Sequence, residues 1–257
     1  MTTASAPNPA LRSRNPALNS RVFGSVSGTV EETMTVSGTA AKAMLYLVVL
    51  LGAATWGWNQ VTPLPGGAVR WPSWVIWVSL GAFGAAMVAT FVPRIAPLMG
   101  AVYSGLQGAA MGAISAIYEI AWEGIVKQAV LVTLGVMLVT LVAYATGLVK
   151  VGPRFRTGVI IATAGIALVY LVGWLWSLFT GGVPFYAQST SIGIWFSVLV
   201  VGLAAFNLLL DFDLIARRSQ EGAPKRLEWY AAFGLMVTLV WLYLEVLRLL
   251  ALTRGRR

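Results

Sequence analysis

The 257-residue chain contains no cysteine and no histidine. Without cysteine it can form no disulfide, no thiolate nucleophile and no cysteine-ligated metal site. Without histidine it lacks the base of a Ser-His-Asp triad, the ligands of an HExxH zinc site and the usual imidazole proton switch. These absences argue against an enzyme. We expect no cofactor, and the residue types leave the question of a metal site undefined.

Charged residues are also scarce. They make up 11% of the chain, whereas 58% of the residues are hydrophobic and the mean hydropathy is +0.78. A soluble domain carries roughly 25% charged residues. The composition therefore predicts an integral membrane protein, whose main partner is the lipid bilayer. The net charge of +9 does not predict a nucleic-acid partner, because Lys and Arg in membrane proteins mostly set orientation.

The first 38 residues are polar and contain no apolar run. They predict a disordered N-terminal tail, and the missing apolar core argues against a signal peptide. Residues 39–257 are predicted to form one transmembrane domain.

Seven apolar stretches follow, each near the ~20 residues that cross a bilayer as a helix. Gly and Pro punctuate the breaks between them, and the short connections predict antiparallel neighbours. The predicted fold is therefore all-α, a polytopic bundle of seven transmembrane helices. The predicted helices cover residues 43–60, 73–92, 96–118, 125–148, 157–180, 190–215 and 227–252.

The basic residues divide unevenly between the two sides of such a bundle. Of the 18 Lys and Arg residues, twelve fall on the side of the N-terminus and five on the other, while Arg248 lies within the last segment. The positive-inside rule then predicts a cytoplasmic N-terminus. Arg254, Arg256 and Arg257 would lie outside, so the last segment either spans against this preference or is re-entrant.

Acidic residues around the sixth and seventh segments are the main candidates for a functional site. Asp211 and Asp213 lie in the apolar stretch 208–215, and Glu228 opens the next segment. An ionisable side chain in lipid costs about 2.5–3.5 kcal/mol even on lenient scales, so such residues are candidate functional sites. In a hairpin centred on residues 219–220, Asp211 and Glu228 lie at similar depth, where two carboxylates can share a proton.

A static arrangement of charges is the alternative interpretation. Glu245 lies deeper in the seventh segment, and Arg248 follows three residues later on the same helix face. In this interpretation Glu245 is half of an internal ion pair, or is neutralised by an interfacial Arg248 whose side chain extends to the membrane surface; otherwise it is a candidate functional acid. The cations that could pair with these acids are Arg217, Arg218, Arg226 and Arg248.

Small and uncharged polar residues occur within the spans. Gly108 and Gly112 form a GxxxG pattern, which allows helices to approach closely. Gln107 and Asn207 are candidates for hydrogen bonds between helices or for contacts with a pore. Packing is the simpler interpretation of all four residues.

Several ordered motifs resemble the transmembrane Bax inhibitor motif family, in particular its bacterial branch. The resemblance covers the chain from about residue 15. It rests on NPALN at 15–19, TMTVSGT at 33–39, residues 105–119, the end of the sixth segment that carries Asp211, EWYAAFG at 228–234 and LYLE at 242–245.

The resemblance implies a seven-helix bundle with the last helix at its centre. Family members are described as pH-sensitive calcium leak proteins gated by one acid on the sixth helix and one on the seventh. Asp211 matches the first acid. The local LYLE motif favours Glu245 as the second, whereas the hairpin depth favours Glu228. Gln107 stands where many relatives carry Glu, which weakens the expectation of strong calcium conduction.

Two functional hypotheses follow. The first is a pH-sensitive leak channel for calcium or other cations, gated by a carboxylate pair. The second is a non-conducting membrane protein that modulates a protease or another membrane protein complex. In both, we expect a multi-pass protein of the cell (inner) membrane with its N-terminus in the cytoplasm.

Overall fold

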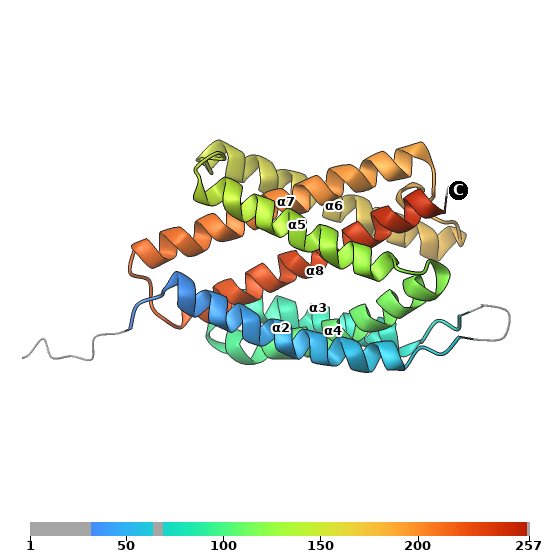
Figure 1. Cartoon of the computed structure of the whole chain (residues 1–257), viewed down its shortest axis with the longest axis horizontal. Coiled ribbons are helices and arrows are strands. Elements are labelled where there is room, and N and C mark those ends of the chain that lie inside the picture. Colours follow the sequence, from blue (N-terminus) through green and yellow to red (C-terminus); the bar gives the residue numbers. More distant parts are fainter. Residues whose placement is uncertain (1–31, 64–68, 256–257) are drawn as a thin grey trace, which may run out of the picture.

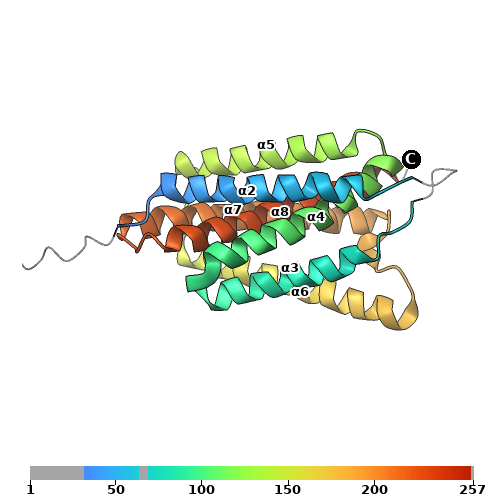
Figure 2. The same ribbon diagram turned by 90° about the horizontal axis from the view of Figure 1, so that it is seen from below.

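A computed structural model describes residues 32–63 and 69–255 of the chain. In this part, seven long helices run roughly along one direction in an elongated bundle, as Figures 1 and 2 show. Two short 3-10 turns, η3 (Pro93–Ile95) and η4 (Phe185–Ala187), lie in the connections. The long helices are α2 (Val36–Asn59), α3 (Trp74–Phe91), α4 (Ala96–Ala121), α5 (Ile125–Ala145), α6 (Pro153–Thr180), α7 (Ser191–Gln220) and α8 (Leu227–Arg254).

Six of these helices are long and apolar enough to cross a membrane, and α4 is the exception. Many large apolar side chains of the six point outward, as expected for a bundle surrounded by lipid. Helix α4 has 26 residues, but its many small residues lower its hydropathy and much of it is buried. The all-helical class and the count of seven helices predicted from the sequence are confirmed.

Helices α2 and α4 pack so closely that their backbones nearly touch. A Cβ at Gly108 would overlap the carbonyl oxygen of Leu50, and one at Gly112 would overlap that of Ala54. From the other side, a Cβ at Gly57 would overlap the carbonyl of Ala109. The GxxxG pattern therefore packs α4 against α2, which is how small residues bring membrane helices together.

Helix α8 is the most buried of the six apolar helices. Over an 18-residue apolar stretch of each helix, 56% of the residues of α8 are buried, compared with 39% in α7 and 22% or less in the other four. It contacts α2, α4, α5 and α7. It is a continuous 28-residue helix. The described chain starts at one end of the bundle and α8 ends at the other (Figure 1), so α8 runs along the bundle without turning back.

The end of α8 is fastened to the connection between α4 and α5. The Arg254 guanidinium donates to the carbonyl of Glu123, at 2.9 Å, and to the side chain of Gln128, at 2.8 Å. Glu119 accepts hydrogen bonds from the backbone N–H groups of Gly124 and Val126 in the same turn. This end of the bundle is therefore tied together by side chains that satisfy exposed backbone groups.

The predicted tail was drawn too long. Residues 32–35, here called the N-terminal strap, lie against the α7–α8 turn and residues 36–38 already belong to α2, while residues 1–31 lie outside the described residues. Met34 is 1% exposed and packs with Ile215, Ala223 and Ala231. Its N–H donates to the Ala223 carbonyl at 2.7 Å. The docking depends on the single apolar side chain of Met34 and on backbone hydrogen bonds. Neither produces a hydrophobic run in the sequence, so the sequence pattern did not indicate it.

Replacement of Gly112 tests the close approach of α2 and α4. We expect Gly112→Val to lower the thermal unfolding temperature in detergent, because the new side chain meets the backbone of Ala54 rather than a flexible group. Overpacking of this kind typically costs about 1–3 kcal/mol. Gly135→Val on α5 is the matched control, since a Cβ there meets no atom of the described chain within 4 Å. Equal unfolding temperatures for the two variants would contradict the packing.

Candidate functional site

Glu228 lies in the first turn of α8 and is fully buried, with 0% exposure. Its Oε1 accepts hydrogen bonds from the N–H and the hydroxyl of Thr35, at 2.8 and 3.0 Å. Its Oε2 forms an ion pair with Lys42 of α2, and the Lys42 ammonium also lies 5.3 Å from the Trp229 ring centroid. Both carboxylate oxygens are therefore occupied, by the N-terminal strap and by α2.

Gly38 makes room for this pair. A Cβ at Gly38 would overlap the Glu228 carboxylate, so only glycine allows the first turn of α2 to lie so close. Thr35 caps the same turn by accepting a hydrogen bond from the Gly38 N–H at 2.9 Å. The short sequence from Thr35 to Gly38 therefore both starts α2 and binds the buried acid of α8.

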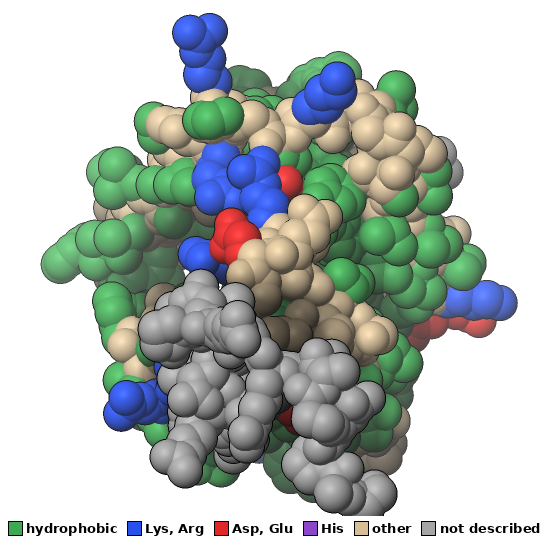
Figure 3. Space-filling view, turned by 90° about the vertical axis from the view of Figure 1, so that its left-hand side faces the viewer, with side chains coloured by type: hydrophobic (Ala, Val, Ile, Leu, Met, Phe, Trp, Pro, Cys, Tyr) green, Lys and Arg blue, Asp and Glu red, His purple; other side chains and the backbone are tan. Residues whose placement is uncertain are grey.

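A second contact of the strap lies at the surface. Glu32 pairs with Lys225 of the α7–α8 turn, and this hydrogen bond and charge raise the pKa of the Lys225 ammonium. The Lys225 N–H also donates to the Glu32 carbonyl at 2.8 Å. Basic side chains are grouped around this end of the bundle, which faces the viewer in Figure 3.

Asp213 joins α7 to α6. It is 5% exposed, and its carboxylate lies 3.3 Å from Arg156 of α6 and 2.9 Å from Arg217, one turn further along α7. Arg217 also donates to the Val151 carbonyl at 2.7 Å. Asp213 is therefore part of an ion-pair network that fixes the 149–152 connection to α7.

Glu245 is paired in the second half of α8. Arg248 lies 2.7 Å from its Oε2. Its Oε1 accepts hydrogen bonds from the hydroxyl of Tyr170 in α6, at 2.7 Å, and from the indole of Trp241, at 3.3 Å. Glu245 and Arg248, which the sequence places three residues apart on one helix face, therefore form an internal ion pair. Two aromatic side chains donate further hydrogen bonds to Glu245.

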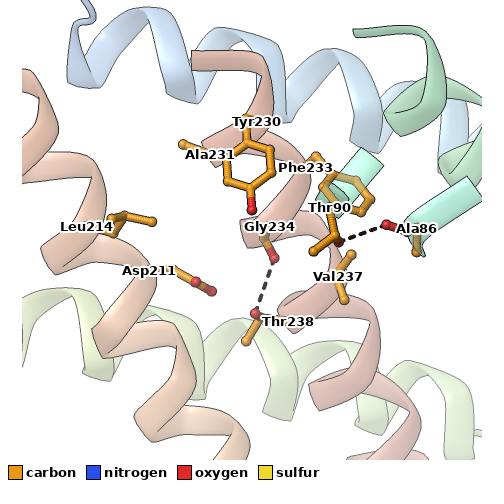
Figure 4. A pocket seen from close by; sticks show the side chains of 10 residues that line it. All are labelled: Ala86, Thr90, Asp211, Leu214, Tyr230, Ala231, Phe233, Gly234, Val237 and Thr238. Atoms are coloured by element: carbon orange, nitrogen blue, oxygen red, sulfur yellow. Dashed lines mark hydrogen bonds between the residues drawn. The ribbon is translucent and has the colours of Figure 1, made fainter. Parts of the chain in front are cut away.

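Asp211 is the acid that stands apart. No Lys or Arg of the described residues lies within ion-pair distance of it. It points from α7 into a cavity of about 290 Å³ between α3, α7 and α8, toward Thr238 (Figure 4). Its Oδ2 is buried and has no hydrogen-bond partner in the described chain. The ten lining residues are Ala86, Thr90, Asp211, Leu214, Tyr230, Ala231, Phe233, Gly234, Val237 and Thr238.

The predicted facing of Asp211 and Glu228 is wrong. No hydrogen bond joins them within the described residues, and Glu228 binds Thr35 and Lys42 instead. Helix α7 continues to Gln220 and α8 begins at Leu227, so the turn is centred about four residues later than we assumed. In an antiparallel pair this places Asp211 level with residues near Thr238, two to three turns beyond Glu228.

The other predicted residues have structural contacts. Arg218 pairs with Glu221 at the surface, whereas Arg226 precedes α8 and pairs with no acid of the described chain. Asn207 donates to the Thr163 hydroxyl at 2.8 Å and so links α7 to α6. Gln107 makes no side-chain hydrogen bond to another described residue, and it is half-buried on α4.

The sequence did not point to the partners of these acids. Lys42 and Thr35 are nearly 200 residues from Glu228, and Tyr170 is 75 residues from Glu245. The one available signal was Lys42, which directly precedes the apolar stretch 43–60 and would need an anion nearby if the helix began earlier. Among the described residues, no group of three or more acids comes together to hold a metal ion.

A lipid-facing surface, long apolar helices and paired charges in the interior define a polytopic α-helical membrane protein. A family model described as Bax inhibitor 1 like matches residues 15–255, so the chain belongs to this family. Comparison with curated proteins gave no match, and comparison with solved structures gave none.

Loss of the Lys42 ammonium tests the buried pair. Lys42→Met leaves the Glu228 carboxylate fully buried without a cation, and breaking such a pair costs about 3–5 kcal/mol. We therefore expect a clearly lower thermal unfolding temperature in detergent. Lys225→Met is the control, because its pair with Glu32 is exposed and we expect no measurable loss. If both variants unfold at the wild-type temperature, the Lys42–Glu228 pair does not stabilise the fold.

Proposed function

We propose that this member of the family is a pH-sensitive cation leak channel, with calcium as the expected ion and Asp211 as the proton-sensing group. One observation carries the proposal: Asp211 faces a cavity within the bundle and has no Lys or Arg of the described residues within ion-pair distance, whereas Asp213, Glu228 and Glu245 are each paired with at least one cation. A carboxylate in such a place responds to pH because nothing else compensates its charge.

The proposed gate depends on the cost of that charge. Protonated Asp211 is neutral, and α3, α7 and α8 can pack around it. Ionised Asp211 places an uncompensated anion between apolar helices, which favours entry of water and a cation. The cost of an acid in lipid, about 2.5–3.5 kcal/mol on lenient scales, corresponds to roughly a hundredfold change in an open-to-closed ratio. Flux should therefore rise as the pH rises.

The arrangement of α8 supports this mechanism. We propose that α8 is the central helix of the bundle, since it contacts α2, α4, α5 and α7 and is the most buried apolar helix. Six of the ten residues around the Asp211 cavity belong to α8. A shift of α8 that admits water to the cavity would therefore change contacts with most of the bundle.

Flux through purified protein in proteoliposomes, measured with a calcium-sensitive dye at several pH values, tests the proposal. We expect wild-type flux to increase with pH. Asp211→Asn keeps the side-chain shape but cannot ionise, so we expect low flux with little pH dependence. Tyr230 is the other titratable side chain that lines the cavity, so Tyr230→Phe should be compared in the same assay.

Paired acids serve as controls. Asp213→Asn, Glu228→Gln and Glu245→Gln change acids that already bind cations, so each should retain the pH dependence even if the protein becomes less stable. A flat profile for Glu228→Gln or Glu245→Gln but not for Asp211→Asn would transfer the sensing role to a paired acid. If wild-type protein carries no cation flux at any pH, the channel proposal fails.

The second candidate is a non-conducting membrane protein that modulates a protease or another membrane complex. The static pairing of three of the four acids and the neutral Gln107 favour it. It predicts no flux in proteoliposomes. It also predicts that Asp211→Asn leaves co-purification with membrane proteins unchanged.

Orientation is the remaining part of the proposal. We propose that the end carrying the α7–α8 turn is cytoplasmic, because most basic residues lie there. The chain has no cysteine, so single cysteines report cleanly. In intact cells an impermeant thiol reagent should label Ser189→Cys but label Gln220→Cys only after permeabilisation. The reverse pattern would invert the topology.

A further inference from the structure

A second cavity lies at the end of the bundle opposite the N-terminal strap. It has a volume of about 440 Å³ and is formed by the ends of α4 and α8, the end of η4 and the connection that follows it. Its wall is mainly apolar, and Arg248 is the one charged residue in it. The lining residues are Ile117, Tyr118, Ala121, Trp122, Ala187, Ser189, Arg248, Ala251 and Leu252.

The Arg248 guanidinium is held firmly on one side. Its Nη2 lies 2.7 Å from Glu245 and 3.5 Å from the Ser197 hydroxyl. Aromatic rings surround it, with its central carbon 5.0 Å from the Tyr170 centroid and 5.7 Å from that of Tyr186. These contacts fix the position of the cation without a second anion.

The same guanidinium has hydrogen-bonding capacity to spare. A guanidinium carries five N–H donors, and the polar contacts of Arg248 in the described chain are both made by Nη2. Its Nε is buried and has no acceptor among the described residues. A buried donor without an acceptor costs free energy, and a ligand in the adjoining cavity can supply that acceptor.

The position of the cavity near the ends of α4 and α8 indicates which chemical groups can reach Arg248 as hydrogen-bond acceptors. Arg248 lies six residues before the end of α8, which is about 9 Å along a helix, and Trp122 lies directly after α4. Helix ends and Trp side chains lie in the interfacial layer of a bilayer, where lipid phosphate and ester groups are found. The apolar remainder of the wall suits the glycerol and upper acyl chain of the same molecule.

We propose that this cavity is a binding site for one phospholipid, whose phosphodiester accepts hydrogen bonds from the free edge of Arg248. Guanidinium and phosphate form well-matched pairs, and Arg248 can bridge the phosphate and Glu245 through different edges. The pair with Glu245 leaves the site with no excess positive charge. The site therefore selects the phosphodiester shared by anionic and zwitterionic lipids. This inference does not depend on ion conduction.

Native mass spectrometry of the detergent-solubilised chain, titrated with phosphatidylglycerol or phosphatidylethanolamine, tests the site. Wild type should bind one lipid of either kind more tightly than any others. Ala121→Trp fills the cavity from an exposed position of α4, and it should weaken this binding about tenfold. The control is Ala145→Trp, which places the same side chain at an exposed position at the end of α5, away from the cavity.

Four results would overturn the proposal. The first is equal lipid binding by wild type and Ala121→Trp. The second is equal loss in Ala121→Trp and Ala145→Trp, which would show a general effect of the added indole. The third is displacement of the lipid by inorganic phosphate alone, which would indicate a free-anion site. The fourth is binding of phosphatidylglycerol but not phosphatidylethanolamine, which would show that net charge is recognised. Folding of each variant is checked by its unfolding temperature.

Discussion

The cost of an uncompensated charge among apolar helices governs the interior of this protein. An apolar interior solvates ions poorly, so each ionised side chain there needs an opposite charge or hydrogen-bond donors. Glu228 has Lys42 and Thr35, Asp213 has two arginines, and Glu245 has Arg248 with two aromatic donors. Asp211 is paired with no cation of the described chain, and its Oδ2 has no hydrogen-bond partner there; this difference is the reason for placing the functional site at its cavity.

The paired charges also connect helices. Lys42 and Glu228 join α2 to α8, and the strap adds the N-terminal residues to the same contact. Asp213 and Glu245 attach α6, which is the least buried apolar helix, to α7 and α8. Each pair therefore contributes orientation as well as charge compensation, because helices in lipid are not driven together by the hydrophobic effect.

Family membership and geometry differ on one point. The resemblance implied two gating acids on neighbouring helices, whereas Asp211 and the two acids of α8 have separate surroundings in the described chain. A single acid without a cation is enough for a proton-sensitive gate, since its ionisation alone changes the charge of the cavity. The two hypotheses for function therefore separate at Asp211, and the paired acids are the natural reference residues.

The sequence alone determined the class of this protein: length and hydropathy of the apolar runs predict seven helices, because crossing a bilayer requires about 20 apolar residues. It also marked the unusual acids and the small residues of α4, since both depend on local composition. Partners were decided by tertiary structure. Lys42 meets Glu228, and α7 runs on to Gln220, through contacts distant in the chain and a turn whose length no local pattern specifies. For these two reasons Asp211 does not face Glu228 in the structure, whereas the sequence pattern predicts that it does.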